Sequence, residues 1–373
     1  MISPYQKSLN NYIKLSNIQT TCNSDLSLDN FSKSNHLGQS ASGMQFGIGR
    51  INNVDVFVKF FCIPCRTKRI KLKNGKEKRR FEKILDPNAL EIGLTKLISS
   101  LLLQENVPTQ NLVFFYASKN CYNAFGVTES KCSGENLELN SETLIPSGTI
   151  YPQRNFISDY DNGNLDDTIR YMVVEKCSGD LQILFNFQAD KMNKGFISKE
   201  EFDETWFSIM AQISITVCIL NDIINPFYHN DFGCRNVLYT DNLLENTFFK
   251  YQFKDKVYNI KNVGIVPKLW DFNYMFIDQN IANNLSKREE FDYLSEHDEF
   301  KTVREEGIPC IVQLCESIMS MENFSYIKDT NFCEFVTEVS RTRCDDFSII
   351  MEFLDNFVPT ENDILLEPVF IYP

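Results

Sequence analysis

The feature that most constrains the fold is a long apolar segment between Glu204 and Ile223, in which large side chains recur at helical spacing. These side chains are Trp206, Met210, Ile213, Val217 and Leu220. A helix with so much apolar surface needs protein around most of it. A chain of 373 residues, of which 43% are hydrophobic, has enough material to surround such a helix. The segment therefore predicts a helix-rich domain built around one buried helix.

Three stretches before this helix predict strands. Residues 37–61 alternate apolar and polar side chains around several glycines, which is typical of two strands joined by a turn. The stretches 111–120 (NLVFFYASKN) and 169–175 (IRYMVVE) are short apolar runs typical of buried strands. The order predicts an α+β fold, with a small sheet lobe over residues 35–176 and a larger helical lobe over residues 177–373.

One helix is expected inside the sheet lobe. Asp86 can cap its first turn, and Pro87 suits the first helical position. Apolar residues then form one stripe at helical spacing: Leu90, Leu94, Leu97, Ile98 and Leu101. This helix would carry Glu91 close to the strands of the same lobe.

Charge and cysteine content restrict the function classes. The net charge of −13 makes nucleic acid an unexpected partner, because a polyanion would be repelled by most of the surface. The 12 cysteines form no regular framework, and the C-x-x-C at Cys62 and Cys65 lacks a second pair at zinc-ribbon spacing. Scattered thiols without a signal peptide predict a reducing compartment, the cytosol. Contiguous apolar runs such as LISSLLL are too short to cross a bilayer, so we expect no transmembrane segment.

Four segments differ in composition from the two lobes. Residues 1–34 are rich in Asn, Ser and Thr and predict an extension that is either flexible or docked on the body. Residues 66–80 contain nine Lys or Arg and favour a solvated loop, with contact to acidic lipid, nucleic acid or an acidic substrate as alternatives. The polar residues 129–168 predict an insertion, and residues 241–262 a second insert.

Five polar residues stand at positions that suggest a common site. The stretch YHNDFGCRNVLY places Asp231 and Asn236 five residues apart, just before a strand-like run. A second strand-like run, GIVPKLW, leads directly into Asp271. Upstream, Lys59 is the lone cation among apolar neighbours in VDVFVKFF, and Glu91 lies on the helix that follows. A buried ammonium needs an anionic partner, which Glu91 could supply.

Each of these residue types has a use if a nucleoside triphosphate is bound. A strand lysine neutralises phosphate oxygens, and Asn and Asp oxygens coordinate Mg²⁺. Another Asp can accept the proton of the attacking hydroxyl. Small residues in LGQSASG, residues 37–43, let backbone N–H groups approach phosphates. The set predicts phosphoryl transfer, because that reaction depends mainly on positioning and charge neutralisation.

These motifs resemble those of the protein kinase superfamily, and they occur in the same order. LGQSASG resembles the glycine-rich loop, and VFVK, ending at Lys59, resembles the V-A-I-K strand. HNDFGCRN resembles H-R-D-L-x-x-x-N, and WDFN resembles D-F-G. The long insert before KLWDF and the stretch LLLQENVPTQNLVFFYASKNC are most similar to the divergent Ser/Thr kinases of large cytoplasmic DNA viruses, the poxvirus and mimivirus type.

The resemblance implies a bilobal kinase-like fold that transfers the γ-phosphoryl group of ATP, with Mg²⁺, to Ser or Thr hydroxyls of a protein substrate. It would place the protein in the host cytoplasm or in the virion. The residues that it assigns to catalysis are Lys59, Glu91, Asp231 and Arg235, and those that it assigns to Mg²⁺ are Asn236 and Asp271. Lys59 would hold the α- and β-phosphates, and Asp231 would deprotonate the acceptor. Arg235 would contact the γ-phosphate.

The nucleotide contacts implied by the resemblance come from two stretches. The glycine-rich loop supplies Gly38, Ser40 and Gly43. The stretch YMVVEKCSGDL looks like the kinase hinge, where Glu175 and Cys177 would lie beside adenine and Asp180 near the ribose. Val174 would precede them as the gatekeeper.

The sequence departs from the family pattern at several positions. Asn230 replaces the Arg that reads an activation-loop phosphate, which predicts activity without that phosphorylation. Gly233 replaces the Lys of Ser/Thr kinases, and Arg235 resembles some tyrosine-kinase loops, so the hydroxyl specificity stays open. Asn273 replaces the D-F-G glycine but tolerates positive φ. No A-P-E segment follows Asp271, which predicts a remodelled substrate-docking region.

Two other functions fit part of the pattern. HND followed by Asn236 and DF.Y is also similar to choline/ethanolamine kinases and aminoglycoside phosphotransferases. A pseudokinase scaffold is the second alternative, because Asn230 and Asn273 depart from the family pattern. Taken singly, His229 favours a structural role in the loop, and Asp180 is also typical of a helix cap.

Overall fold

The structure is a computed structural model, and it describes part of the chain. The described residues are 4–16, 45–51, 53–71, 77–83, 87–121, 165–224, 227–242, 247–272, 275, 309–342 and 348–358. Several predicted features lie outside them: the loop residues Gly38, Ser40 and Gly43, the capping residue Asp86, and Asn273.

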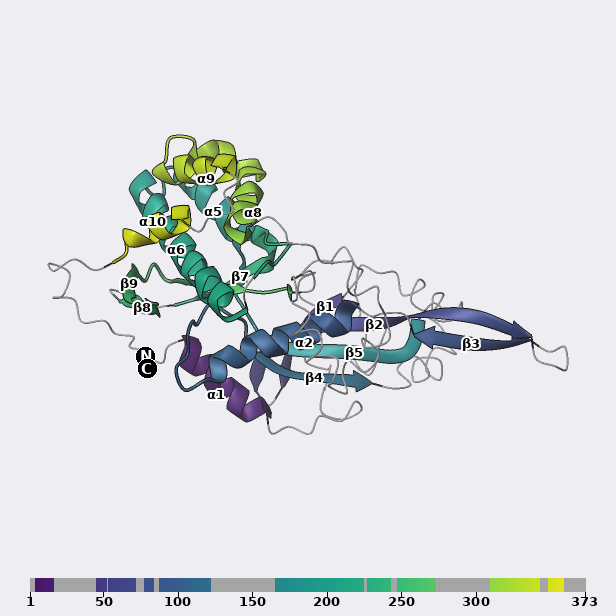
Figure 1. Cartoon of the computed structure of the whole chain (residues 1–373). Helices are drawn as coiled ribbons and strands as arrows, with labels where there is room; N and C mark the ends of the chain where they lie inside the picture. Colours follow the sequence, from purple (N-terminus) through teal and green to yellow (C-terminus); the bar gives the residue numbers. More distant parts are fainter. Residues whose placement is uncertain are drawn as a thin grey trace.

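An antiparallel sheet of five strands forms the first half of the fold (Figure 1). Its strands are β1 (Gln45–Ile51), β2 (Val54–Lys71), β3 (Glu77–Lys83), β4 (Phe115–Cys121) and β5 (Leu165–Glu175). Their order is β1, β2, β5, β4, and β3 pairs with the far part of β2. The turn between β1 and β2 contains Asn53 at a positive φ of 62°, a conformation that Asn adopts more readily than most residues. Within the described residues, the predicted strands are confirmed as β1 and β2, as β4, which begins at Phe115 rather than at Asn111, and as β5.

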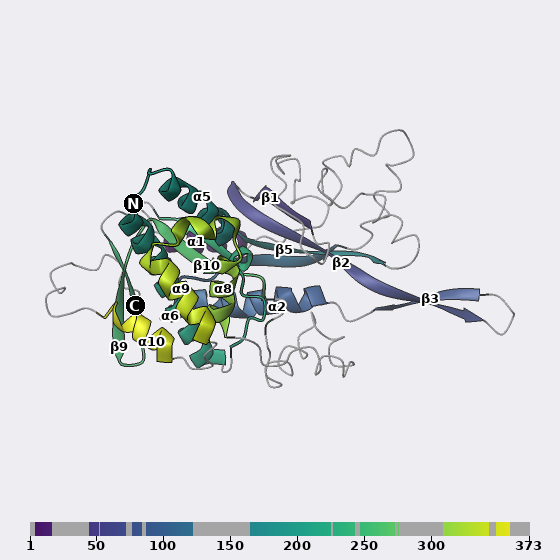
Figure 2. The same ribbon diagram turned by 90° about the horizontal axis from the view of Figure 1, so that it is seen from above.

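The basic stretch is a correction to the sequence analysis. Residues 65–71 pair with residues 77–83 in a ribbon made by β2 and β3, with Arg66 opposite Glu82 and Lys71 opposite Glu77, so residues 66–80 do not form one loop. This ribbon projects beyond the rest of the sheet (Figures 1 and 2). The pairing of two strands through their backbones does not require apolar residues, so charge alone was a poor sign of a loop. The predicted insertion over 129–168 is also shortened, because β5 begins at Leu165.

Two helices accompany this sheet. Helix α2 (Pro87–Ser99) starts at the expected proline and continues into the short helix η2 (Ser100–Leu103). Helix α1 (Pro4–Ser16) belongs to the predicted N-terminal extension and lies beside β4 (Figure 1). The hydroxyl of Tyr5 donates to the carbonyl of Leu102 at 2.9 Å. The described part of the extension is therefore docked on the body.

The second half is mainly helical. Its helices are α5 (Leu181–Asn193), α6 (Lys199–Ile224), α8 (Cys310–Met319), α9 (Asn331–Thr342) and α10 (Ser348–Asp355), with short turns η3 (Cys234–Asn236) and η8 (Glu322–Ile327). The predicted central helix is confirmed as α6, in which Trp206, Met210 and Ile213 are fully buried. By length and composition α6 could also cross a membrane, but 78% of its apolar window is buried inside the protein. Helices buried in a protein core can have the same length and apolar composition as a membrane-spanning helix.

Short strands follow α6 and position the polar residues of interest. They are β6 (Gly179–Asp180), β7 (Val237–Asp241) and β10 (Ile265–Leu269), in the order β10, β7, β6, and the separate hairpin of β8 (Phe248–Phe253) and β9 (Lys256–Lys261). The hairpin accounts for most of the predicted 241–262 insert and lies near α6 and α10 (Figure 1).

One hydrophobic core runs through both halves. Its members include Val56, Val58, Leu94 and Val173 from the sheet side, and Trp206, Ile213, Leu269 and Leu314 from the helical side. Helices and antiparallel sheets are combined in this core, so the predicted α+β class is confirmed.

Candidate functional site

The predicted Lys59 and two of its predicted partners lie together. Lys59 is fully buried on β2, and its Nζ lies 2.5 Å from Oε1 of Glu91 on α2. The same Nζ lies 3.0 Å from Oδ1 of Asp271, which directly follows Trp270 after β10. The indole ring of Trp270 is 5.6 Å from Nζ, so it adds a cation–π contact. Three segments that are distant in sequence therefore meet at one ammonium group.

The electrostatics of this cluster are unbalanced. Burial opposes the charge of Lys59, but the carboxylates of Glu91 and Asp271 outweigh it and raise the lysine pKa. Burial raises the pKa of Glu91 to about 8, because the attraction of Lys59 does not offset the desolvation of its carboxylate and the repulsion of Asp271. One ammonium thus faces two carboxyl groups, an arrangement that another cation would relieve.

Strand register places Asp271 beside Asn236. Leu269 of β10 pairs with Val237 of β7, and the N–H of Trp270 donates to the carbonyl of Asn236 at 3.2 Å. The strands are antiparallel, so the residue that precedes β7 lies next to the residues that follow β10. Asp271 has a positive φ of 63°, a strained conformation for a residue with a side chain. The fold therefore holds an amide and a carboxylate at one end of this strand pair.

Asn236 also orients Asp231. Its Nδ2 donates to Oδ2 of Asp231 at 2.8 Å and to the carbonyl of Asp231 at 2.7 Å. Because the amide donates through nitrogen, its oxygen Oδ1 remains for a different ligand. Asp231 is exposed, and the preceding Asn230 has a positive φ of 63°. The loop thus presents the carboxylate of Asp231 to solvent in a defined orientation.

His229 ties the same loop to the end of β10. Its Nε2 donates to the carbonyl of Trp270 at 2.8 Å, and its ring packs against Phe232 and Phe272. Burial lowers the pKa of His229, so the imidazole is held neutral. Nε2 carries the proton, since a carbonyl oxygen can only accept. The contact agrees with a structural role for this histidine.

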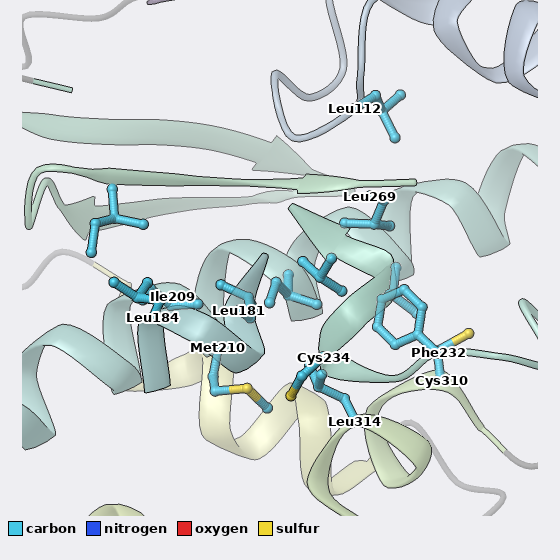
Figure 3. Close-up of a cluster of buried hydrophobic side chains, with 14 of the residues drawn as sticks. Leu112, Leu181, Leu184, Ile209, Met210, Phe232, Cys234, Leu269, Cys310 and Leu314 are labelled. Carbon is cyan, nitrogen blue, oxygen red and sulfur yellow. The ribbon is translucent and has the colours of Figure 1, made fainter. Parts of the chain in front are cut away.

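Helix α8 supports the loop through residues that the sequence analysis missed. Three acceptors at positions i, i+3 and i+7 bind backbone N–H groups of the loop: Cys310 Sγ binds His229 at 3.4 Å, Gln313 Oε1 binds Phe232 at 2.8 Å, and Ser317 Oγ binds Cys234 at 3.0 Å. Figure 3 shows Phe232 beside Cys310 and Cys234 beside Leu314. Polar residues recurring on one face of the apolar helix CIVQLCESIM were the signal available in the sequence.

The predicted residues near α5 have mainly local contacts. Arg235 is exposed, and its Nε donates to Oε1 of Gln182 at 2.6 Å. This bond leaves the two terminal amino groups of Arg235 for another acceptor. Oδ1 of Asp180 accepts from the N–H of Ile183 at 2.8 Å, so Asp180 caps α5. Burial raises the pKa of Asp180, although this capping bond acts in the opposite direction.

Glu175, predicted beside a nucleotide base, has a buried side chain engaged by protein. Its Oε1 accepts from the hydroxyl of Ser8 at 2.5 Å, and its Oε2 accepts from the N–H of Phe114 at 3.2 Å. The ammonium of Lys268 lies 3.2 Å from the same Oε2. The carboxylate therefore joins α1, the start of β4 and β10. Ser8 lies in no recognisable motif, and Lys268 lies in the run GIVPKLW, which predicted only a strand, so neither residue was identified from the sequence.

Cys177 lies in a different environment. It is partly buried and packs, with Phe57 and Leu238, against a small apolar cluster that contains Val174 and Trp270. Trp270 and Phe57 meet edge to face, with ring centroids 5.9 Å apart. This apolar surface is close to the residues around Lys59, because Trp270 contacts both groups.

The described residues include two candidate ligands for Mg²⁺, Asn236 and Asp271. Within the described residues, no three His, Cys, Asp or Glu side chains are grouped closely enough to hold a metal. Mg²⁺ in phosphoryl-transfer sites needs only one or two protein carboxylates, because substrate phosphates supply other ligands. The oxygens of Asn236 and Asp271 fit such a partial set. The six cysteines whose side chains the structure describes, Cys177 among them, are free thiols.

Comparison with known proteins gives two partial similarities. No family model matches the chain. The chain is 28% identical over 135 residues to "Putative serine/threonine-protein kinase R400" of Acanthamoeba polyphaga mimivirus. This match covers 35% of the chain and 27% of that protein. The chain is 32% identical over 78 residues to "Putative serine/threonine-protein kinase R301" of the same virus, 20% of each protein. The chain thus matches about a quarter or less of the length of these curated relatives. Over that part, the chain is related to viral proteins that are named as protein kinases.

Proposed function

We propose that this protein is a kinase that transfers the γ-phosphoryl group of ATP to Ser or Thr hydroxyls of protein substrates. The observation that carries the proposal is the position of Lys59, whose Nζ lies within 3.0 Å of both Glu91 and Asp271. The names of the two viral relatives favour protein rather than small molecules as the acceptor. In this proposal the five-stranded sheet and the helical half are two lobes, and the substrate site lies where they meet.

Lys59 and Glu91 would bind and orient the phosphates. The ammonium of Lys59 would bind α- and β-phosphate oxygens, while Glu91 keeps its Nζ in place on β2. Phosphate binding would place negative charge next to two carboxyl groups, so the site needs a cation besides Lys59. Asn236 and Asp271 are the residues that would hold Mg²⁺, which when bound would neutralise phosphate charge.

Asp231 would serve the acceptor side of the reaction. Asn236 binds its Oδ2 at 2.8 Å and fixes the carboxylate, so its second oxygen can receive the proton of the acceptor hydroxyl. The hydroxyl oxygen would form the new bond to the γ-phosphorus as the bond to the β-phosphate bridge oxygen breaks, and ADP would leave. The exposure of Asp231 suits a macromolecular acceptor that approaches from solvent.

The remaining nucleotide contacts divide between apolar and polar groups. Phe57, Cys177 and Leu238 offer partly buried apolar surface to a purine base. Arg235 would bind the γ-phosphate with its terminal amino groups, because its Nε is already bonded to Gln182. Asp180 would bind the ribose with its carboxylate while Oδ1 continues to accept from the N–H of Ile183. Gly38, Ser40 and Gly43 keep their proposed role in phosphate binding.

Transfer from labelled ATP to a generic protein substrate, with Mg²⁺, tests this function. Lys59→Met, Asp231→Asn and Asp271→Asn should each reduce transfer by about 100-fold or more, because each removes charge stabilisation or proton transfer. Asp241→Asn is the matched control, since Asp241 is an exposed aspartate at the end of β7 whose side chain accepts from the hydroxyl of Ser178. Phosphoamino-acid analysis would separate Ser and Thr from Tyr.

Three outcomes would overturn the proposal. Transfer to choline but not to protein would indicate a small-molecule kinase. Nucleotide binding without transfer by the folded wild-type protein would indicate a pseudokinase. Equal transfer by wild type and the Asp231→Asn variant would remove Asp231 from the chemistry.

A further inference from the structure

A buried polar cluster outside the candidate site centres on Asn111. This residue is fully buried in the segment that leads into β4. Its Nδ2 donates to Oε1 of Gln212 on α6 at 3.2 Å and to the carbonyl of Pro267 in β10 at 2.9 Å. Its Oδ1 accepts from the hydroxyl of Tyr251 at 2.6 Å, and at longer distances from the hydroxyls of Thr109 at 3.1 Å and Thr216 at 3.3 Å. Asn111 therefore joins α6, β10 and the inserted hairpin.

Asn111 also holds β10 through its backbone. Its carbonyl accepts from the N–H of Leu269 at 2.8 Å, and the N–H of Val113 donates to the carbonyl of Leu269 at 3.4 Å. Leu112 and Leu269 form a parallel bridge and lie near each other in the core (Figure 3). The other edge of β10 is paired with β7. Both edges of β10 are thus bonded just before the chain reaches Asp271.

Tyr251 reaches this cluster from β8, in the insert between β7 and β10. Tyr251 and Tyr258 are directly opposite each other in the hairpin, and both are buried against α6 residues such as Ile215. Their hydroxyl groups differ: Tyr251 donates to Asn111, whereas no hydrogen-bond partner for the Tyr258 hydroxyl occurs among the described residues. Among the described residues, the hydroxyl of Tyr251, and not that of Tyr258, therefore links the hairpin to β10 through Asn111.

We infer that Tyr251 is a positioning residue for Asp271 and that the β8–β9 hairpin is a brace for the strand that presents it. The hydroxyl of Tyr251 fixes the side chain of Asn111, Asn111 fixes the carbonyl of Pro267 and the amide of Leu269, and these set the direction in which the chain leaves β10. A hydrogen bond to a buried, fully engaged amide is sensitive to the loss of one partner. The insert would thus act on the metal-binding end of the site without touching it.

Hydrogen exchange tests the brace independently of any enzymatic activity. Tyr251→Phe removes one hydroxyl and keeps the ring, and the loss of one such bond should accelerate amide exchange in residues 265–271 by about 5- to 30-fold. Tyr258→Phe is the matched control and should leave these rates unchanged. Residues 181–193 of α5 provide an internal reference. Equal rates in the two variants, or a uniform acceleration that includes α5, would overturn the brace.

The effect on Asp271 rests on the proposed function and needs a second readout. In Tyr251→Phe the Mg²⁺ concentration for half-maximal transfer should rise about fivefold or more, while kcat at saturating Mg²⁺ changes less, and Tyr258→Phe should match wild type. Accelerated exchange with an unchanged Mg²⁺ requirement would overturn the positioning of Asp271. If wild type transfers no phosphate, the proposed function fails, and titration of Mg²⁺ by binding calorimetry on the same variants decides the positioning instead.

Discussion

The amine of Lys59 lies 3.0 Å from Oδ1 of Asp271, although 212 residues separate them in the chain. Lys59 belongs to the five-stranded sheet, whereas Asp271 follows the last strand of the small sheet beside α6. The contact therefore joins two structural units that the sequence presents separately. Glu91 and Asp271 therefore share the single ammonium group of Lys59, and this should affect how the stability of the protein depends on pH.

Stability should fall as pH rises, because of Glu91. Its ordinary pKa of 4.5 is raised to about 8 by burial. Between these values the folded protein retains a proton that the unfolded chain has released, so the free energy of unfolding decreases with increasing pH. The Glu91→Gln variant has no titratable group at this position, so this contribution to the pH dependence is absent from it. Urea unfolding at about pH 5 and pH 8 should show the stability of wild type declining relative to the variant, and a constant difference would contradict the raised pKa.

Gln313 should affect turnover more than nucleotide binding. Its side chain accepts from the N–H of Phe232, one residue after Asp231, and Gln313→Ala would leave that group without its acceptor. A less fixed loop should lower kcat about tenfold or more, whereas nucleotide affinity should stay within about twofold. Glu316→Ala, on the same helix, is the control. Steady-state kinetics and a nucleotide-binding titration test this, and an unchanged kcat would show that the α8 contact is dispensable.

Ser8 should contribute to global stability despite its position near the N-terminus. Ser8→Ala removes the donor to Oε1 of the buried Glu175, which should lower the free energy of unfolding by about 1–3 kcal/mol. Lys7→Ala, an exposed neighbour on α1, should change it by less than about 0.5 kcal/mol. Chemical unfolding of both variants gives the comparison. Equal stabilities would mean that the docking of α1 does not depend on this bond.

Cys177 should report nucleotide binding. Burial raises its thiol pKa, so alkylation by a maleimide should be slow but measurable at about pH 8. If a base packs against Phe57, Cys177 and Leu238, Mg²⁺ and ATP at ten times the Kd should slow alkylation of Cys177 by about tenfold. Mg²⁺ with inorganic phosphate, which lacks the base, should not protect. Peptide mass spectrometry measures both rates, and unaltered labelling with ATP would remove Cys177 from the base site.

Local patterns predicted several elements because their causes lie within a few residues. The apolar spacing around Trp206 identified α6, the proline at position 87 marked the start of α2, and the run at 169–175 identified most of β5. The charge of residues 66–80 misled, because a paired ribbon and a solvated loop tolerate the same composition. Gln313 and Ser317 escaped notice because their partners are backbone groups about 80 residues away.

The sequence by itself determined several strands, the helices α2 and α6, and which residue types could bind phosphate and metal, since periodicity and side-chain chemistry are local properties. Only the tertiary structure decided that Lys59 meets both Glu91 and Asp271, that Glu175 faces Ser8 and Lys268, and that Tyr251 reaches Asn111. These contacts depend on strand register and on how helices pack across the core. Both are set by many distant residues acting together, so no short stretch of the chain contains them.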